Sequence, residues 1–508
     1  MDFLDKIDSY AAESNKIAQI YRDSILTYKE LKEKSDALAC YIIEKYGQDK
    51  TPILIYGHKQ HEMLISFLAC SKAGHAYIPV DVTFPSARVN DIIESSGSKL
   101  FINIGELEYD SKTLEILNVN EVNNIMEKYK GETPDRKYRV EHDDNYYILY
   151  TSGSTGKPKG VQITKGCLAT FMEWFLKYAE VSQGKDVIID QPSYSFDLSV
   201  VNVYVGLYKG NTLYTIDKKM VESFQELYDH LGKSNIATWV ATPSFTDMCM
   251  LDDKFNRELL PNLERMIFSG EVLPKKLAHR LFERFPGVKI VNGYGPTEAT
   301  VFVDAVEVTP EIMSTDKSIP IAFNMEGGTL LVIDEAGKEV AVGEKGEFII
   351  IGDTVSPGYY NNEEITKKVF FKVEENGVIK RGYKTGDLVY KDVDGYIYYC
   401  GRKDFQIKLN GYRMEIEDIE NNIRKLELIN NAVIFPVYKD DKVANLTAFV
   451  TLKEKNEEKE FKMVLKIKEE LKRLIPAYMV PKNIKIKEQL PTNSNGKVDR
   501  KKLMEELR

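Results

Sequence analysis

Cysteine and histidine are scarce in this sequence of 508 residues, and neither is arranged for disulfide formation or metal binding. The five cysteines, Cys40, Cys70, Cys167, Cys249 and Cys400, are scattered, odd in number and without a CxxC pair. The six histidines do not fall at the spacings of metal ligands. The sequence therefore argues against a disulfide framework and a structural zinc site, and it favours a reducing, cytoplasmic location.

Long apolar runs and long basic stripes are also missing. No segment approaches the roughly 20 apolar residues that cross a bilayer. The first residues, MDFLDK, lack the basic region and apolar core of an export signal. We therefore expect no stable insertion in a membrane. Because the net charge of −9 is spread along the chain and forms no basic stripe, we expect no nucleic-acid partner.

The chain is too long for one hydrophobic core, so two or more domains are expected. Helical patterns at 26–46 and 61–72 alternate with strand patterns at 51–57 and 76–80, which predicts parallel α/β layers. Short strands and tight turns follow from about residue 316, and an α+β pattern begins after the turn at 401–404. We predict an α/β and β fold with a large domain over 1–403, a β-barrel-like subdomain at roughly 316–400 and a small α+β domain over 404–508.

The most informative segment is 150–160, YTSGSTGKPKG, which follows a short apolar run typical of a buried strand. Its glycines let the backbone wrap around an anion, and its hydroxyl and N–H groups can donate to phosphate oxygens. It is not a Walker A loop, because Thr151 stands where the first glycine should be and Pro158 follows Lys157. The segment predicts a nucleoside triphosphate site, the alternative being a flexible surface loop.

Ten motifs in order resemble those of the adenylate-forming superfamily, the acyl- and aminoacyl-adenylating ligases. They are LTYKEL at 26–31, KAGHAYIPVD at 72–81, the loop at 150–160, FDLS at 196–199, NGYGPTE at 292–298, GEF at 346–348, YKTGD at 383–387, GRKDFQIKLNGYR at 401–413, PAYMVP at 476–481 and NGKVDR at 495–500. The resemblance implies a large domain of sandwiched sheets with a β-barrel and a small mobile domain, and it implies ATP and Mg²⁺ as cofactors. In this superfamily a carboxylate attacks the α-phosphate of ATP, and a thiol then attacks the acyl-adenylate and releases AMP.

The resemblance also implies roles for particular residues. Lys497 matches the catalytic lysine, which contacts the substrate carboxylate and the α-phosphate, and Glu298 matches the Mg²⁺ ligand. Asp387 matches the acceptor of both ribose hydroxyls, Tyr294 the residue that stacks on the adenine, and Asp404 the hinge. The implied ATP-binding residues are Thr151, Ser152, Gly153, Ser154, Thr155, Gly156, Lys157, Asn292, Gly293, Tyr294, Gly295, Pro296, Thr297, Asp387, Tyr399, Cys400, Gly401, Arg402, Arg413 and Lys497. Non-catalytic alternatives are a turn-capping role for Asp387 and a first-turn helix carboxylate for Glu298.

Asp197 indicates the substrate class, because superfamily members that activate α-amino acids carry an aspartate here that pairs with the substrate ammonium. Its alternative is a cap on a helix that starts near Leu198. The resemblance places Ser269, Val301 and Lys497 around the amino acid as well. Ser269 stands where cysteine is often found, and it either preserves the choice of enantiomer or admits glycine, L-alanine or D-serine.

Within the superfamily the chain resembles the stand-alone ligases that load D-alanine onto the phosphopantetheine of a separate carrier protein, for transfer to lipoteichoic acid. An adenylating enzyme for another small amino acid in nonribosomal peptide synthesis is the nearest alternative. An acyl-CoA synthetase is disfavoured by Asp197, and a nucleotide-binding pseudoenzyme by the retained motifs. Lys275, Lys276 and Arg280 form a candidate docking patch for an acidic carrier, the alternative being a solvated helix face.

Overall fold

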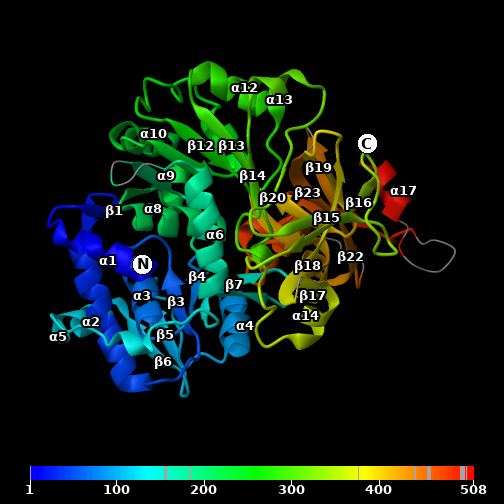
Figure 1. Cartoon of the computed structure of the whole chain (residues 1–508). Coiled ribbons are helices and arrows are strands. Elements are labelled where there is room, and N and C mark those ends of the chain that lie inside the picture. Colours follow the sequence, from blue (N-terminus) through cyan, green and yellow to red (C-terminus); the bar gives the residue numbers. More distant parts are fainter. Residues whose placement is uncertain are drawn as a thin grey trace. The chain divides into compact units, whose positions relative to one another are not determined.

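The computed structural model describes residues 2–153, 157–181, 184, 186–375, 377–439, 442–454, 459–491, 498 and 500–507, with the side chain of residue 501 left out. The chain forms two compact units (Figure 1). Unit 1 comprises residues 1–82, 96–150 and 160–403, and unit 2 comprises residues 83–95, 151–159 and 404–508. The continuous C-terminal part of unit 2 thus begins at Asp404, and two short segments from earlier in the chain belong to the same unit.

The largest sheet of unit 1 has eight strands in the order β14-β13-β12-β11-β9-β10-β1-β2. Its inner pairs are parallel, whereas the pairs β13–β14 and β1–β2 at its two ends are antiparallel. The strands are β1 (Ile17–Tyr21), β2 (Ser24–Thr27), β9 (Val187–Asp190), β10 (Thr212–Thr215), β11 (Thr238–Ala241), β12 (Arg265–Phe268), β13 (Lys289–Tyr294) and β14 (Asp304–Glu307).

A second, six-stranded sheet has the order β6-β5-β3-β4-β7-β8. Its strands are β3 (Ile53–Gly57), β4 (Tyr77–Asp81), β5 (Leu100–Asn103), β6 (Glu115–Asn118), β7 (Asn145–Thr151) and β8 (Lys159–Thr164). Every residue of β3, β4 and β5 is buried, which explains why these strands read as continuous rather than alternating apolar runs. The two sheets share one hydrophobic core, to which Ile55 and Tyr147 contribute from one sheet and Ile188 and Leu213 from the other.

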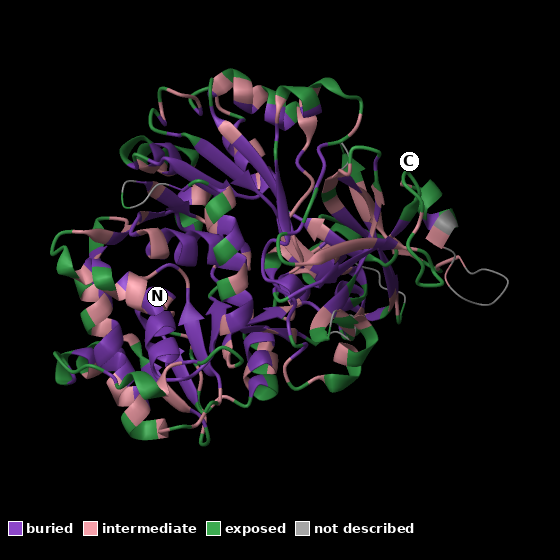
Figure 2. Cartoon of the chain, in the orientation of Figure 1, coloured by how far each residue is buried: buried purple, intermediate pink, exposed green. Residues whose placement is uncertain are grey.

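Helices cover these two sheets, and their outward faces are exposed while the strands are buried (Figure 2). The α-helices of unit 1 are α1 (Phe3–Ser9), α2 (Tyr28–Tyr46), α3 (His61–Lys72), α5 (Val119–Lys128), α6 (Lys165–Tyr178), α7 (Leu198–Val200), α8 (Gly206–Lys209), α9 (Lys218–Glu222), α10 (Phe224–Lys233), α11 (Pro243–Cys249), α12 (Lys275–Arg284), α13 (Pro310–Ser314) and α14 (Glu363–Val369). Short 3-10 helices are η1 (Tyr10–Ala12), η2 (Arg136–Tyr138) and η4 (Thr297–Ala299), and η3 (Val201–Val205) is a π-helix between α7 and α8.

The predicted β-rich region forms a five-stranded antiparallel sheet in unit 1, in which β18 pairs with β16, β17 and β19. Its strands are β15 (Thr329–Ile333), β16 (Lys345–Ile351), β17 (Phe370–Glu375), β18 (Val378–Lys391) and β19 (Ile397–Arg402). Phe348, Ile350, Val389 and Ile397 from this sheet join Tyr294 in a core of their own. This core therefore connects the sheet to the end of β13.

Unit 2 has a hairpin, β20 (Gln406–Leu409) with β21 (Tyr412–Glu415), and a three-stranded sheet in the order β22-β23-β24. The sheet strands are β22 (Ile429–Lys439), β23 (Lys442–Leu452) and β24 (Asn483–Lys487), and the helices are α15 (Ile416–Arg424), α16 (Glu460–Leu471), η5 (Ala477–Met479), α17 (Arg500–Glu505) and most of α4 (Ser86–Ser96). Ile419, Ile434, Ala448 and Ile467 anchor its core.

The predicted fold class, with mixed α/β layers, a β-rich region and a smaller α+β C-terminal domain, is confirmed. Among the residues described, no helix combines the length and the apolar character needed to span a bilayer.

Candidate active site

The carboxylate of Asp197 lies against a residue of the predicted nucleotide motif. Thr297, at the start of η4, donates a hydrogen bond from Oγ1 to Asp197 Oδ2 at 2.6 Å. Asp197 immediately precedes α7, but its side chain makes no capping hydrogen bond to that helix. The capping alternative therefore finds no support, and the structure brings together two predicted site residues that lie 100 positions apart.

A second cluster joins three residues of the predicted nucleotide site. Asp387, on β18 and 4% exposed, accepts a hydrogen bond from Arg402 Nη1 at 2.5 Å and another from the hydroxyl of Tyr294. Burial raises the pKa of Tyr294 well above its usual value, and the charge of Asp387 raises it further. The phenol therefore stays protonated and remains a donor to the carboxylate. Asp387 is held by side chains rather than by capping a turn.

Glu298 is fully buried in η4 and accepts a hydrogen bond of 2.7 Å from the hydroxyl of Tyr359. Its backbone carbonyl accepts another from the N–H of Ser356. Tyr359 belongs to no motif singled out in the sequence, and no local signal identifies a partner 61 residues away. Among the described residues no group of three or more His, Cys, Asp or Glu side chains could hold a metal ion by itself.

The backbone after η4 is strained. Thr300 has φ +60° and Val301 has φ +68°, and both are buried β-branched residues, for which the left-handed region is costly. Such strain concentrates at functional sites, where the surrounding structure holds it in place. Gly295 makes this packing feasible, because a Cβ there would lie 2.4 Å from the carbonyl oxygen of Val301.

The predicted phosphate loop is described at Thr151, Ser152, Gly153 and Lys157, whereas Ser154, Thr155 and Gly156 lie outside the described residues. The Thr151 hydroxyl is buried and has no hydrogen-bond partner among the described residues. Gly153 is required for the close approach of the loop to itself, because a Cβ there would lie 2.3 Å from the Lys157 carbonyl oxygen. Gly153 thus lies close to the Lys157 backbone, and Thr151 provides a buried hydroxyl that no described residue engages.

Within unit 2, Ser152 also contacts the segment that carries Arg413. Its hydroxyl donates to the Arg413 carbonyl at 3.2 Å and accepts from the Glu415 N–H at 3.2 Å. The Arg413 guanidinium donates from Nε to Gln406 at 2.6 Å. The structure therefore brings Ser152 and the backbone of Arg413 together, and Gln406 is one partner of the Arg413 side chain.

The other predicted site residues have partners outside the two clusters described above. Asn292 donates to the Pro320 carbonyl at 2.9 Å, and Ser269 is buried directly after β12. Burial raises the pKa of the Cys400 thiol, which keeps it protonated. Gly293 lies beside the Phe302 ring, and Pro296 directly precedes η4. Tyr399 of β19 is half-buried, and Gly401 has φ +110°. Asp404 is exposed, and its carboxylate accepts a hydrogen bond from the Gln406 N–H.

Two predictions are not tested by this geometry. Lys497 lies outside the described residues, so its catalytic role stays a prediction. In the predicted docking patch, Lys275 donates to the Ile312 carbonyl at 2.8 Å and Arg280 pairs with Asp247 at 3.0 Å. These contacts engage two of the three cations with the protein's own groups, and carrier docking at this patch stays a prediction.

Comparison with known proteins adds an independent line of argument. Residues 8–360 match the family model of the AMP-binding enzymes, and residues 418–497 match that of the AMP-binding enzyme C-terminal domain. The D-alanine–D-alanyl carrier protein ligases of Bacillus cytotoxicus and Bacillus mycoides are each 44% identical to the chain over 508 residues, which is 100% of both sequences in each pair.

Solved structures share the fold. The Vibrio cholerae adenylation domain AlmE in complex with glycyl-adenosine-5′-phosphate aligns with a TM-score of 0.82 at 23% identity, covering 100% of this chain and 97% of that one. An NRPS protein containing adenylation and PCP domains aligns with a TM-score of 0.83 at 24% identity, covering 99% and 84%. From the family models and the full-length identity, the chain belongs to the AMP-binding enzymes and, within them, to the family of the D-alanine–D-alanyl carrier protein ligases.

Proposed function

We propose that the protein activates D-alanine with ATP and transfers it to the phosphopantetheine thiol of a separate carrier protein, for D-alanylation of lipoteichoic acid. The observation that carries the proposal is the pairing of Asp197 with Thr297 in a chain 44% identical, end to end, to ligases of that name. A carboxylate at this position suits a substrate ammonium, because a charge-assisted pair discriminates strongly against acids that lack the amine.

ATP fits the residues present. The buried Thr151 hydroxyl, which has no partner in the described part of the chain, and Gly153, which lies close to the Lys157 carbonyl, suit a phosphate oxygen held close to the backbone. The buried Asp387 suits the ribose hydroxyls, with Arg402 and Tyr294 fixing its orientation. Glu298 would hold Mg²⁺ as one protein carboxylate supplemented by phosphate oxygens and water, a common arrangement for this ion, which would neutralise phosphate charge.

The first step forms a bond between a carboxylate oxygen of D-alanine and the α-phosphorus, while the bond from that phosphorus to the bridging oxygen breaks and pyrophosphate leaves. In the second step the carrier thiol loses its proton to water and its sulfur attacks the acyl carbon. The C–S bond forms, the C–O bond breaks and AMP leaves with that electron pair. Both reactants of the first step are anions, so its catalysis consists mainly of positioning and charge neutralisation.

Lys497 would supply the positive charge for the first step, and Ser269 and Val301 would line the methyl side of the amino acid. Asp404, the first residue of the C-terminal part of unit 2, would be the hinge about which the small domain turns between the two steps. We assign the reaction to the cytoplasm, where ATP is available.

The test is amino-acid-dependent exchange of pyrophosphate into ATP with D-alanine, L-alanine, glycine and D-serine, followed by mass spectrometry of a phosphopantetheinylated carrier. We expect exchange with D-alanine and a carrier heavier by one alanyl group. Exchange only with an amino acid other than D-alanine would favour the alternative, an adenylating enzyme of nonribosomal peptide synthesis. Absence of any exchange would refute the proposal.

A further inference from the structure

Lys59 is a fully buried lysine outside the predicted active site. It lies between β3 and α3, in the six-stranded sheet layer, and its side chain is 0% exposed. Its Nζ donates to Asp190 Oδ1 at 2.6 Å and to the Pro192 carbonyl at 2.7 Å, and it lies 3.8 Å from the centroid of the Tyr194 ring. All three partners belong to the other sheet layer, at the end of β9 and directly after it.

The contacts around Asp190 make this lysine part of a closed network. Asp190 Oδ2 accepts from the Tyr194 hydroxyl at 2.7 Å and from Thr215 Oγ1 at 3.1 Å. Gln19 donates to the Lys59 carbonyl at 3.1 Å and to Thr215 Oγ1 at 3.0 Å. A buried network whose members are all hydrogen-bonded is rigid, since each shift would leave a buried polar group unpaired.

The network reaches the segment directly before the residue proposed to bind the substrate. Residues 191–196 connect β9 to Asp197, and Lys59 fixes this segment at Pro192. One residue on, the Ser193 hydroxyl donates to Asp81 at 2.6 Å, and Asp81 is held in turn by His58 at 2.8 Å. The Phe196 N–H then donates to the Ser193 carbonyl at 2.9 Å, which closes the turn immediately before Asp197.

We propose that Lys59 is a positioning residue for amino-acid selection: it anchors segment 191–196, so that the Asp197 carboxylate stands where the substrate ammonium binds. The inference rests on the proposed role of Asp197. It goes further by assigning part of the specificity to a lysine that touches no substrate. A displacement of about 1 Å at such a carboxylate is enough to weaken transition-state binding on the order of a hundredfold.

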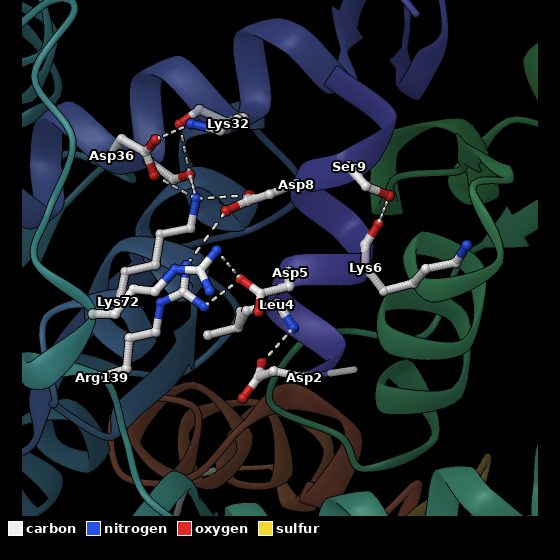
Figure 3. A network of polar contacts seen from close by, with 12 residues as sticks. Asp2, Leu4, Asp5, Lys6, Asp8, Ser9, Lys32, Asp36, Lys72 and Arg139 are labelled. Atoms are coloured by element: carbon white, nitrogen blue, oxygen red, sulfur yellow. Dashed lines mark hydrogen bonds and ion pairs between the residues drawn. The ribbon is translucent and has the colours of Figure 1, made fainter. Parts of the chain in front are cut away.

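Lys72 provides a matched control, because it is also 0% exposed and paired with carboxylates. Its Nζ donates to Asp36 at 2.6 Å, to Asp8 at 2.8 Å and to Ser35 at 3.0 Å, and this cluster ties α1 and α2 to α3 (Figure 3). None of these partners lies in the segment that leads to Asp197. Removing the Lys72 pair therefore perturbs the core to a similar degree without acting on the substrate carboxylate.

The experiment compares the double variants Lys59→Met/Asp190→Asn and Lys72→Met/Asp36→Asn, each of which removes the buried lysine charge together with the carboxylate charge closest to it. In the control, Asp8 loses Lys72 but keeps Arg139 at 3.8 Å, and Lys32 loses its pair with Asp36. The readout is the ratio of kcat/KM for D-alanine to that for D-lactate, which has a hydroxyl in place of the ammonium, in the pyrophosphate exchange assay. We expect the Lys59 double variant to lower this ratio about tenfold or more. The Lys72 double variant should leave the ratio unchanged, because a general loss of activity affects both substrates alike.

Two single Tyr→Phe variants, which remove only one hydroxyl each, keep the test decisive if a double variant fails to fold. Tyr194→Phe removes only the hydroxyl that bridges Asp190 and Gln19, and Tyr28→Phe removes an equally buried hydroxyl that donates to Asn211 at 2.7 Å. We expect the ratio to fall in Tyr194→Phe and to stay constant in Tyr28→Phe. A constant ratio in both Lys59→Met/Asp190→Asn and Tyr194→Phe would overturn this inference but not the proposed function. An equal fall of the ratio in the control variants would do the same. A wild-type chain without D-alanine-dependent exchange would overturn the proposed function as well.

Discussion

The pair formed by Asp387 and Arg402 gives a prediction with a magnitude. Asp387 is 4% exposed and the Arg402 side chain is 10% exposed, with 2.5 Å between the paired atoms. Arg402→Met leaves a buried carboxylate with the Tyr294 hydroxyl but without its charged partner. Breaking a buried pair from one side costs about 3–5 kcal/mol, whereas removing both charges is close to neutral. We therefore expect Arg402→Met to be strongly destabilising and Arg402→Met/Asp387→Asn to recover to within about 1 kcal/mol of the wild type.

Urea denaturation followed by tryptophan fluorescence measures this difference, because both tryptophans, Trp174 and Trp239, are buried in unit 1 with the pair. Asn at 387 still accepts from Tyr294, so the double variant leaves no phenol unpaired. A single variant as stable as the double variant would refute the reasoning, since it would mean that Arg402 does not compensate the charge of Asp387.

The same double variant separates folding from nucleotide binding. If Asp387 accepts from the ribose hydroxyls, the loss of hydrogen bonds to a charged group weakens binding by about 1.5–3 kcal/mol. The ATP dissociation constant measured by titration calorimetry should then rise roughly ten- to a hundredfold although the fold is retained. Unchanged ATP affinity in the double variant would remove Asp387 from the nucleotide site.

Four further outcomes are expected. Asp197→Asn should lower kcat/KM for D-alanine roughly 30- to 1000-fold, equivalent to about 2–4 kcal/mol of transition-state stabilisation, at an unchanged KM for ATP; an unchanged kcat/KM for D-alanine would argue against the ammonium contact. Lys497→Ala should slow adenylation on the order of 10²–10³-fold and spare thiol transfer from preformed adenylate; equal loss of both steps, seen in single-turnover assays, would contradict the assignment. Ser269→Cys should sharpen the preference for D- over L-alanine in the exchange assay by no more than about 1–3 kcal/mol, and an unchanged ratio would exclude Ser269 from chiral selection. Burial raises the pKa of Asp304 to about 6 from 3.8, so its contribution to stability is present below pH 4 and is lost as the pH rises through 6; a wild-type stability profile identical in slope to that of Asp304→Asn would exclude this.

Local patterns predicted the regular elements well where periodicity was strong. The predicted helix at 61–72 coincides with α3, and the strand predicted at 76–80 is β4, shifted by one residue. The pairing of the strands could not be predicted in this way. β1 pairs with β10, aligning Gln19 with Leu213, and no local feature of either strand specifies a partner so distant in sequence. The π-helix at Val201–Val205 and the strained Thr300 and Val301 are similarly set by packing rather than by propensity.

The sequence motifs identify individual site residues but not the residues to which they hydrogen-bond. The sequence identified Asp387 and Tyr294 separately, whereas their hydrogen bond joins residues 93 positions apart. Tyr359 and Lys59 carry no motif, because a tyrosine that holds a carboxylate and a lysine that anchors a loop have roles only in three dimensions. Sequence reasoning therefore finds groups that contact ligands more readily than the groups that hold them in place.

The short segment from Tyr294 to Glu298 links the parts of the proposed site. Tyr294 donates to the carboxylate proposed for the ribose, Thr297 donates to the carboxylate proposed for the ammonium, and Glu298 is the carboxylate proposed for Mg²⁺. Two of these acidic groups thus receive hydrogen bonds from side-chain hydroxyls of one short segment, in which Gly295 packs against Val301. Since buried carboxylates are costly without donors, the segment keeps both charges in place before either ligand binds. The relative positions of nucleotide and amino acid are then determined by the fold rather than by the ligands, which is the requirement for bringing two anions into reaction.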